Sequence, residues 1–127
     1  MTSLVVQKYG GSSVSSDKRI LEVADHIAHT VKAGNQVVVV VSAMGSSTDE
    51  LIDLANKVSK KPSLREMDML LTTGERVSMA LLSIALNGKG VETVSFTGSQ
   101  AGIKTDSNHG RAKIMAITPH RVEEALS

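Results

Sequence analysis

Apolar residues along the chain alternate between short β-rich runs and longer stretches with helical spacing. A β-rich run at residues 4–9 breaks at Gly10-Gly11. Apolar residues over 20–31 then recur at i, i+3, i+4, i+7 and i+8, which predicts an α-helix that Gly34 ends. The chain therefore begins with a strand, a glycine turn and an amphipathic helix.

The most apolar run of the chain, residues 36–42, contains five consecutive valines. β-branched residues without alternation predict a strand buried on both faces, as in the centre of a parallel sheet. Residues 47–50 (Ser-Thr-Asp-Glu) have the capping-box pattern of a helix start. An apolar stripe over 51–58 continues that second helix.

The second half of the chain starts with a helical pattern and ends with shorter elements. Ser63 and Glu66 form another capping box, and helical spacing continues to Gly88, with a bend or break expected at Thr73-Gly74. We predict the remaining elements in this order: a third strand at 91–96, a hairpin of strands at 103–105 and 112–117, and a short helix from Pro119.

The order of these elements predicts an α/β fold. Strands that alternate with helices imply crossover connections and a parallel sheet covered by helices. The expected unit is one domain, residues 1–127. Its sheet would need more strands than this sequence provides.

Composition narrows the class of function. Aromatic residues are limited to Tyr9 and Phe96, and the net charge is +1 with basic residues scattered, so a nucleic-acid interface is not expected. Cysteine is absent, and no basic leader with a long apolar stretch precedes the first strand. The longest apolar run, 37–41, is far short of a membrane span. We expect a cytoplasmic protein without a membrane partner.

The turn after the first strand is the most informative candidate site. Gly10 and Gly11 lack Cβ atoms and let backbone N–H groups approach phosphate oxygens, and the following helix adds a favourable dipole. Lys8, two positions earlier, would supply positive charge for phosphoryl transfer. The spacing fits neither a Walker A loop nor G-x-G-x-x-G, and an ordinary strand-to-helix turn would also account for it.

Two later segments add polar groups. Residues 42–49 (SAMGSSTD) follow the carboxyl end of the valine strand, where open α/β sheets bind ligands, although a plain helix cap would also explain them. Glu75 could bind a substrate ammonium group or be a surface carboxylate beside Arg76. His26 and His29 flank the apolar stripe of their helix, and no metal site is predicted.

Taken together and in order, four segments resemble the N-terminal signatures of the aspartate kinase family, particularly its actinobacterial-like members. They are VQKYGGSSV, VVVVVSAMGSSTDEL, MDMLLTTGERVS and FTGSQAGI, and the resemblance spans essentially the whole chain. It implies the N-terminal part of a parallel-sheet-based three-layer sandwich of the amino-acid kinase (carbamate-kinase-like) type.

The resemblance also implies ATP-dependent phosphorylation of the β-carboxylate of L-aspartate to 4-phospho-L-aspartate, with Mg²⁺ as cofactor. That reaction is the first step toward lysine, threonine and methionine. Two groups of residues take roles by this likeness. Lys8, as the catalytic residue, with Tyr9, Gly10, Gly11, Ser12 and Ser42 would bind the ATP phosphates. Gly45, Ser46, Ser47 and Thr48 would hold the aspartate carboxylates, and Glu75 the amino group.

This sequence departs from the family mainly in length. Members continue into a further glycine-rich loop, an Asp/Arg-bearing substrate segment, a nucleoside pocket and regulatory ACT-type domains, none of which is present here. Tyr9 and Ser12 stand where relatives often have Phe and Thr. The chain alone is expected to be inactive or nearly so. Alternatives are another amino-acid kinase, such as one acting on glutamate, or a non-catalytic truncated module that self-associates or binds a full-length kinase.

Overall fold

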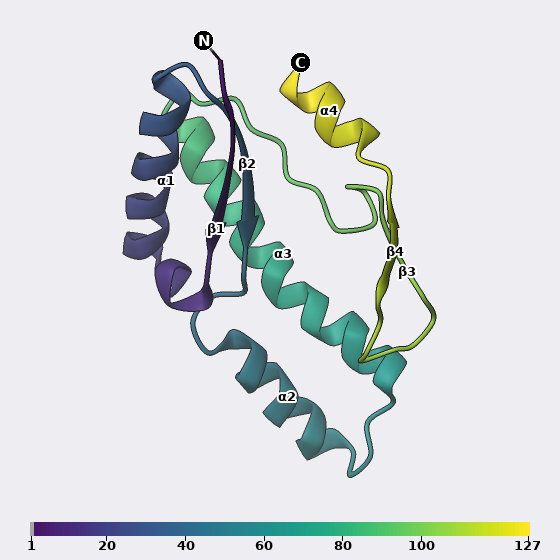
Figure 1. Ribbon diagram of the computed structural model, residues 1–127. Coiled ribbons are helices and arrows are strands. Elements are labelled where there is room, and N and C mark those ends of the chain that lie inside the picture. Colours follow the sequence, from purple (N-terminus) through teal and green to yellow (C-terminus); the bar gives the residue numbers. More distant parts are fainter. Residues whose placement is uncertain (1) are drawn as a thin grey trace.

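The computed structural model describes residues 2–127 as a small parallel sheet with helices, followed by a hairpin and a last helix (Figure 1). In chain order the elements are β1 (Leu4–Tyr9), the 3₁₀ turn η1 (Gly11–Val14), α1 (Asp17–Lys32), β2 (Gln36–Val41), α2 (Ser47–Val58), α3 (Leu64–Gly88), β3 (Ile103–Thr105), β4 (Ile114–Ile117) and α4 (His120–Leu126).

The parallel pair β1–β2 is the centre of the fold, and α1 is its crossover helix. Its register runs from Leu4 opposite Gln36 to Tyr9 opposite Val41. Helix α1 begins where the Ser16 side chain accepts a hydrogen bond from the Arg19 amide, which satisfies one of the free N–H groups of the first turn. The predicted strand–helix–strand start of an α/β fold is confirmed.

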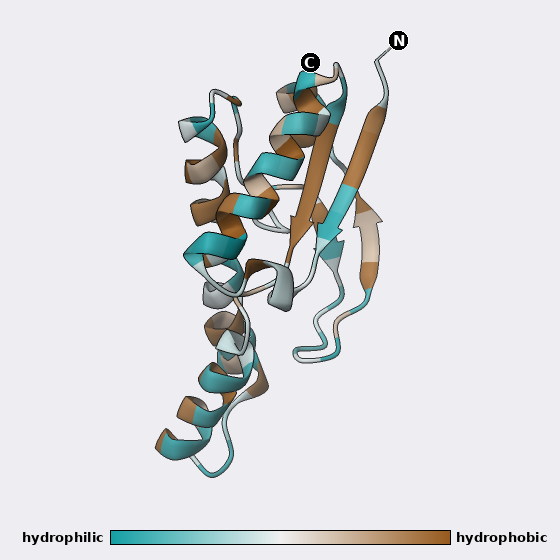
Figure 2. Ribbon diagram, turned by 90° about the vertical axis from the view of Figure 1, so that its left-hand side faces the viewer, coloured by the Kyte–Doolittle hydropathy of each residue, from teal (hydrophilic) through white to brown (hydrophobic). Residues whose placement is uncertain are grey.

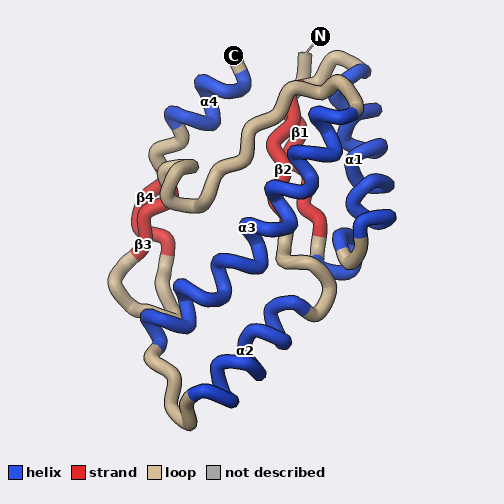
Figure 3. Tube along the Cα trace, turned by 180° about the vertical axis from the view of Figure 1, so that it is seen from behind, coloured by secondary structure: helices blue, strands red, loops and turns tan. Residues whose placement is uncertain are grey.

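The hydrophobic core lies on one face of this sheet, where α1 and α3 pack together against the strands (Figure 3). Val37, Val39 and Val41 point toward it because alternate side chains of a strand share a face. Its buried members are Val14, Ile20, Val23, Ala24, Ile27, Ala28, Leu82, Leu86 and Val91. Aliphatic and alanine side chains fill this core without a tryptophan or phenylalanine.

The opposite face of the sheet is apolar and open. The exposed fractions of Leu4, Val6 and Val40 are 58%, 64% and 52%, and both strands are hydrophobic over most of their length (Figure 2). Burial of the valine strand on both faces, as predicted, is therefore wrong for residues 2–127, because helices cover only one side. This part of the chain contributes two layers of the expected three-layer sandwich.

Two other predictions need correction. Residues 91–96 form an extended segment and not a third strand, because no neighbouring strand in the described part of the chain bonds to their backbone. Helix α3 runs unbroken through Thr73-Gly74. The predicted hairpin is confirmed as the antiparallel pair β3–β4, with β4 starting two residues later than expected.

Helix α3 is also long and apolar enough to match a membrane span by length and composition. It has 25 residues, most of them apolar or uncharged. Its Gly74, Ser78, Leu82 and Leu86 are buried inside the fold. The core helix of a folded domain can have the same length and composition as a membrane span.

Candidate functional site

The turn after β1 and the loop after β2 are bonded to each other at the carboxyl edge of the sheet. The Ser42 amide donates to the Tyr9 carbonyl at 3.0 Å, and the Gly45 amide donates to the Gly11 carbonyl at 2.9 Å. The sequence predicted both segments as ligand-binding loops, and the structure brings them together. In open α/β sheets this edge is where ligands bind.

Gly11 leaves room for this close approach. A Cβ atom there would lie 3.0 Å from the Ala43 carbonyl oxygen and 3.1 Å from that of Gly45. Both neighbours are backbone atoms, which cannot rotate away as a flexible side chain can. Gly10 is different, because a Cβ there would meet no atom within 4 Å. The two glycines of the doublet thus have separate roles, and Gly11 keeps the two loops in contact.

Several backbone N–H groups at this edge are free to bind an anion. Within residues 2–127, the amides of Gly10, Gly11 and Ser12 donate to no protein acceptor, and neither do those of Thr48 and Asp49 in the first turn of α2. Unpaired amides at the start of a helical turn form a favourable site for phosphate or carboxylate. The geometry therefore offers one such site after each strand.

Lys8 and Tyr9 lie on opposite faces of β1. The exposed Lys8 side chain forms no hydrogen bond or ion pair with any described residue, on the open face beside Val40. The Tyr9 hydroxyl donates to Gln7 Oε1 at 2.9 Å, its ring meets that of His26 edge-on, and burial raises its pKa. Tyr9 thus reaches the candidate site through its backbone, whereas Lys8 has a free ammonium group.

Helix α3 supports the loop after β2 from behind. The buried Ser78 hydroxyl lies 2.7 Å from the Ser42 carbonyl oxygen and 3.0 Å from that of Glu75. One turn earlier, a Cβ at Gly74 would lie only 3.1 Å from the Ala43 Cβ. The glycine that the sequence marked as a helix break instead lets α3 pack closely against this loop.

Replacing Ser78 with alanine should lower the free energy of unfolding by about 1–2 kcal/mol, because the Ser42 carbonyl loses a buried donor. Chemical denaturation of the chain measures this change. Ser83→Ala is the matched control, since Ser83 lies on the same helix and its hydroxyl makes no recorded hydrogen bond. Equal stability of both variants would show that the Ser78 bond does not hold the loop.

The start of α2 differs from the predicted capping box. The N-cap is Ser46, whose hydroxyl bonds to the Glu50 carboxylate at 3.1 Å and caps no backbone amide. Ser47 lies in the first turn and its amide donates to the Met44 carbonyl at 2.8 Å. Because no side chain covers the next two amides, the helix start stays available to an anionic group.

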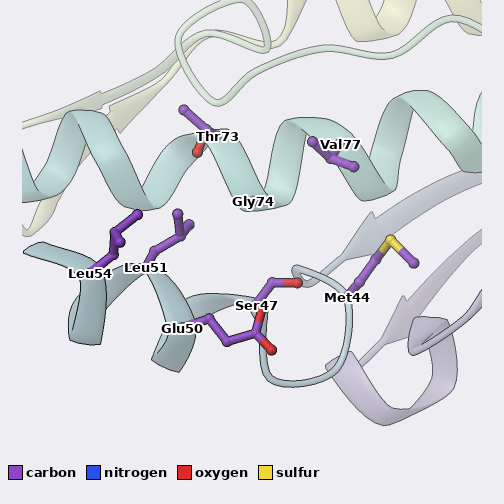
Figure 4. A pocket seen from close by; sticks show the side chains of 8 residues that line it. All are labelled: Met44, Ser47, Glu50, Leu51, Leu54, Thr73, Gly74 and Val77. Carbon is purple, nitrogen blue, oxygen red and sulfur yellow. The ribbon is translucent and has the colours of Figure 1, made fainter.

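A groove of about 330 Å³ separates α2 from α3 (Figure 4). Leu51 and Leu54 reach into it from α2, while Ser47 and Glu50 lie at the end where α2 begins. Ser47 is the one member of the predicted site that lines it. The groove is largely apolar, so it is not the phosphate-binding region that the sequence predicted.

Glu75 lies on a different side of α3 from this groove. Its exposed carboxylate forms no ion pair or hydrogen bond with residues 2–127. It follows Asp68 by seven residues, which places the two on nearly the same helix face. The structure therefore separates Glu75 from the α2–α3 groove and leaves it open to a cationic ligand.

The donor set of this site suits anions and not a metal ion. Lys8 and the free amides only donate, and no cluster of three or more His, Cys, Asp or Glu in the described part of the chain could hold a metal. A divalent cation at this edge would need its oxygen ligands from a bound phosphate compound or from elsewhere.

Sequence comparison decides the family. The profile of the Amino acid kinase family matches residues 3–127. The chain belongs to the amino acid kinase family.

Relatives within the amino acid kinase family are much longer than this chain. It is 60% identical over 124 residues to the aspartokinases of Mycolicibacterium smegmatis and Corynebacterium glutamicum, and 55% identical over 123 residues to that of Geobacillus stearothermophilus. These alignments cover 97–98% of this chain and 30% of each relative. The chain thus spans about a third of the length of the relatives that it matches.

A solved structure supports the fold. The crystal structure of aspartate kinase from Synechocystis matches with a TM-score of 0.75 and 58% sequence identity, over 77% of this chain and 17% of that chain. The predicted amino-acid kinase fold, N-terminal part, is therefore confirmed, together with the family resemblance.

The α3 residues that hold the loop after β2 and the β3–β4 turn were not predicted from the sequence. Ser78 follows Gly74 by four residues on the buried face of α3. A polar residue and a glycine one turn apart on an apolar stripe indicate close packing against a backbone segment, so the spacing of Gly74 and Ser78 could have predicted this contact. Asp68, whose carboxylate bonds to the β3–β4 turn, carried no comparable local signal.

Proposed function

We propose that the chain is the part of an aspartate kinase that binds the ATP phosphates and L-aspartate. The proposed reaction transfers the γ-phosphoryl group of ATP to the aspartate β-carboxylate and gives 4-phospho-L-aspartate. The observation that carries the proposal is the bonded pair of loops after β1 and β2, with free amides and an unpaired Lys8. Aspartokinase relatives that are 55–60% identical support the choice of reaction.

On this proposal the turn after β1 binds the ATP phosphates. Amides of Gly10, Gly11 and Ser12 would donate to phosphate oxygens, and Lys8 would stabilise the charge on the transferring group. Tyr9 and Ser42 would shape the site through the backbone bond that joins the two strand ends. Phosphoryl transfer depends mainly on positioning and charge, so this donor set suits it.

The aspartate would bind between the loop after β2 and α3. The free amides at Thr48 and Asp49, with Gly45 (φ +50°), Ser46 and Ser47 forming the turn before them, would receive a substrate carboxylate. The Glu75 carboxylate would pair with the ammonium group of the substrate.

Mg²⁺ would enter with ATP. Because residues 2–127 hold no cluster of three or more metal-ligating side chains, the phosphates of the nucleotide and water would supply most of the oxygen ligands of the ion. We further propose that the protein acts in the cytoplasm at the first step toward lysine, threonine and methionine, without nucleic acid or membrane partners, and that it self-associates or binds a longer kinase.

The test is an acyl-phosphate assay with ATP, Mg²⁺, aspartate and hydroxylamine. A chimera in which this chain replaces the matching 124 residues of the Mycolicibacterium smegmatis relative should form aspartyl hydroxamate at a rate close to that of the relative itself. The isolated 127 residues should turn over slower by orders of magnitude, because catalytic groups act as a unit.

Two outcomes would contradict the proposal. A folded chimera that phosphorylates glutamate or acetylglutamate but not aspartate would assign another amino-acid kinase activity. A folded chimera that is inactive on all three substrates would favour a non-catalytic assembly module.

A further inference from the structure

The β3–β4 hairpin has few apolar contacts with the rest of the fold. Every residue of β4 is exposed, and Met115 is 70% exposed. Hairpins alone are marginally stable in water, so polar contacts must fix this one in place.

One of these contacts is a carboxylate on α3 that fastens the hairpin turn. Asp68 Oδ1 and Oδ2 lie 3.1 and 3.0 Å from the Gly110 amide nitrogen, and Oδ2 lies 3.1 Å from His109 Nδ1. Gly110 has φ +78° and packs beside Leu64. Within the turn, Asp106 accepts from the Asn108 and Lys113 amides, and these bonds lower its pKa. The turn is therefore internally ordered as well as tied to α3.

A second tether lies at the far end of this segment. Gln36 Nε2 donates to the Leu126 carbonyl at 2.6 Å, which joins α4 to the start of β2. Figure 1 shows the hairpin between these two points, with its turn at the start of α3 and α4 beside the chain's N-terminus. Loss of the Asp68 contact would leave the hairpin held at one end.

The turn is bonded to α3 at Asp68, about two helical turns before Glu75 and on nearly the same helix face. Asp68 and Glu75 are seven residues apart, so they differ by about 20° around the axis and by about 10 Å along it. The hairpin is therefore positioned relative to Glu75 through a single helix.

We propose that Asp68 is a positioning residue that holds the β3–β4 hairpin beside the Glu75 side of the acceptor site. This proposal rests on the proposed function, because Glu75 is a substrate ligand only there. A fixed hairpin would keep the acceptor oriented and exclude water from its ammonium group. The bond from Asp68 to the hairpin turn, called the latch below, therefore affects the affinity for the acceptor more than the rate of phosphoryl transfer.

The kinetic test uses the chimera described above. Asp68→Ala should raise the KM for aspartate about tenfold while changing kcat less than threefold and leaving the KM for ATP near its original value. Asp68→Asn keeps an acceptor for the Gly110 amide and should recover part of the affinity. Asp53→Asn, an exposed carboxylate on α2, is the matched control and should change nothing.

A second readout follows the latch directly in the 127-residue chain. Hydrogen exchange at the Gly110 amide should speed up about tenfold in Asp68→Ala and stay unchanged in Asp53→Asn. An active chimera whose Asp68→Ala variant keeps its aspartate KM, or unchanged Gly110 exchange, would overturn the latch. An inactive parent chimera would instead count against the proposed function. The exchange rate of the Gly110 amide would still show whether Asp68 holds the hairpin turn.

Discussion

Replacing Lys8 with methionine is expected to abolish most phosphoryl transfer, with kcat/KM falling about a hundredfold or more. Methionine keeps the length of the side chain and removes its charge. Lys8 is exposed on the open face of β1 and pairs with no described residue, so the fold does not depend on its ammonium group. The hydroxamate assay on the chimera measures the rate, and a denaturation curve checks that folding is intact.

Lys57→Met is the matched control for this prediction. Lys57 is exposed in the last turn of α2, remote in sequence from both loops, and its loss should leave the rate unchanged. If the Lys8 and Lys57 variants are equally active, the ammonium group at the end of β1 has no catalytic role.

Replacing Gly11 with alanine is expected to lower the free energy of unfolding by about 1–3 kcal/mol and to remove most activity in the chimera. The new methyl group would press on the carbonyl oxygens of Ala43 and Gly45 at 3.0 and 3.1 Å. The two loops would have to move apart by a few tenths of an ångström, which displaces the amides that face the phosphates.

Gly10→Ala provides a control within the same doublet. Gly10 has extended backbone angles (φ −77°, ψ 174°) that alanine adopts easily, and open space surrounds its Cβ direction. The free energy of unfolding of the Gly10→Ala variant should stay within about 0.5 kcal/mol of that of the parent. If both variants lose the same stability, close packing between the loops is not the reason for the glycine at position 11.

The sequence predicted the fold well where local patterns determine structure. The valine run, the apolar stripe of α1 and the Gly34 stop predicted the parallel β1–α1–β2 unit with bounds within three residues of those observed. Residues 91–96 have strand propensity but no partner among residues 2–127, and pairing is a non-local property that composition does not contain. The helix break predicted at Gly74 was wrong. A glycine stands there because α3 packs closely against Ala43, which lies 31 positions away in the chain.

The candidate site was predictable only where local sequence patterns determine it. Strand ends followed by glycine and hydroxyl residues indicated both loops, and parallel pairing brings them to one edge. Which glycine is constrained could not be read from the doublet itself, since both lack side chains. The supports from Ser78 and Asp68 depend on tertiary contacts and were visible only in the structure.

The most direct test of the central claim is amide chemical-shift mapping of the 127-residue chain during titration with Mg²⁺-ATP. The account predicts that the amides of Gly10, Gly11 and Ser12 shift first and together, and that Lys8→Met weakens this response. Shifts confined to another surface, such as the basic pair Lys60-Lys61, with the turn after β1 unmoved, would contradict it.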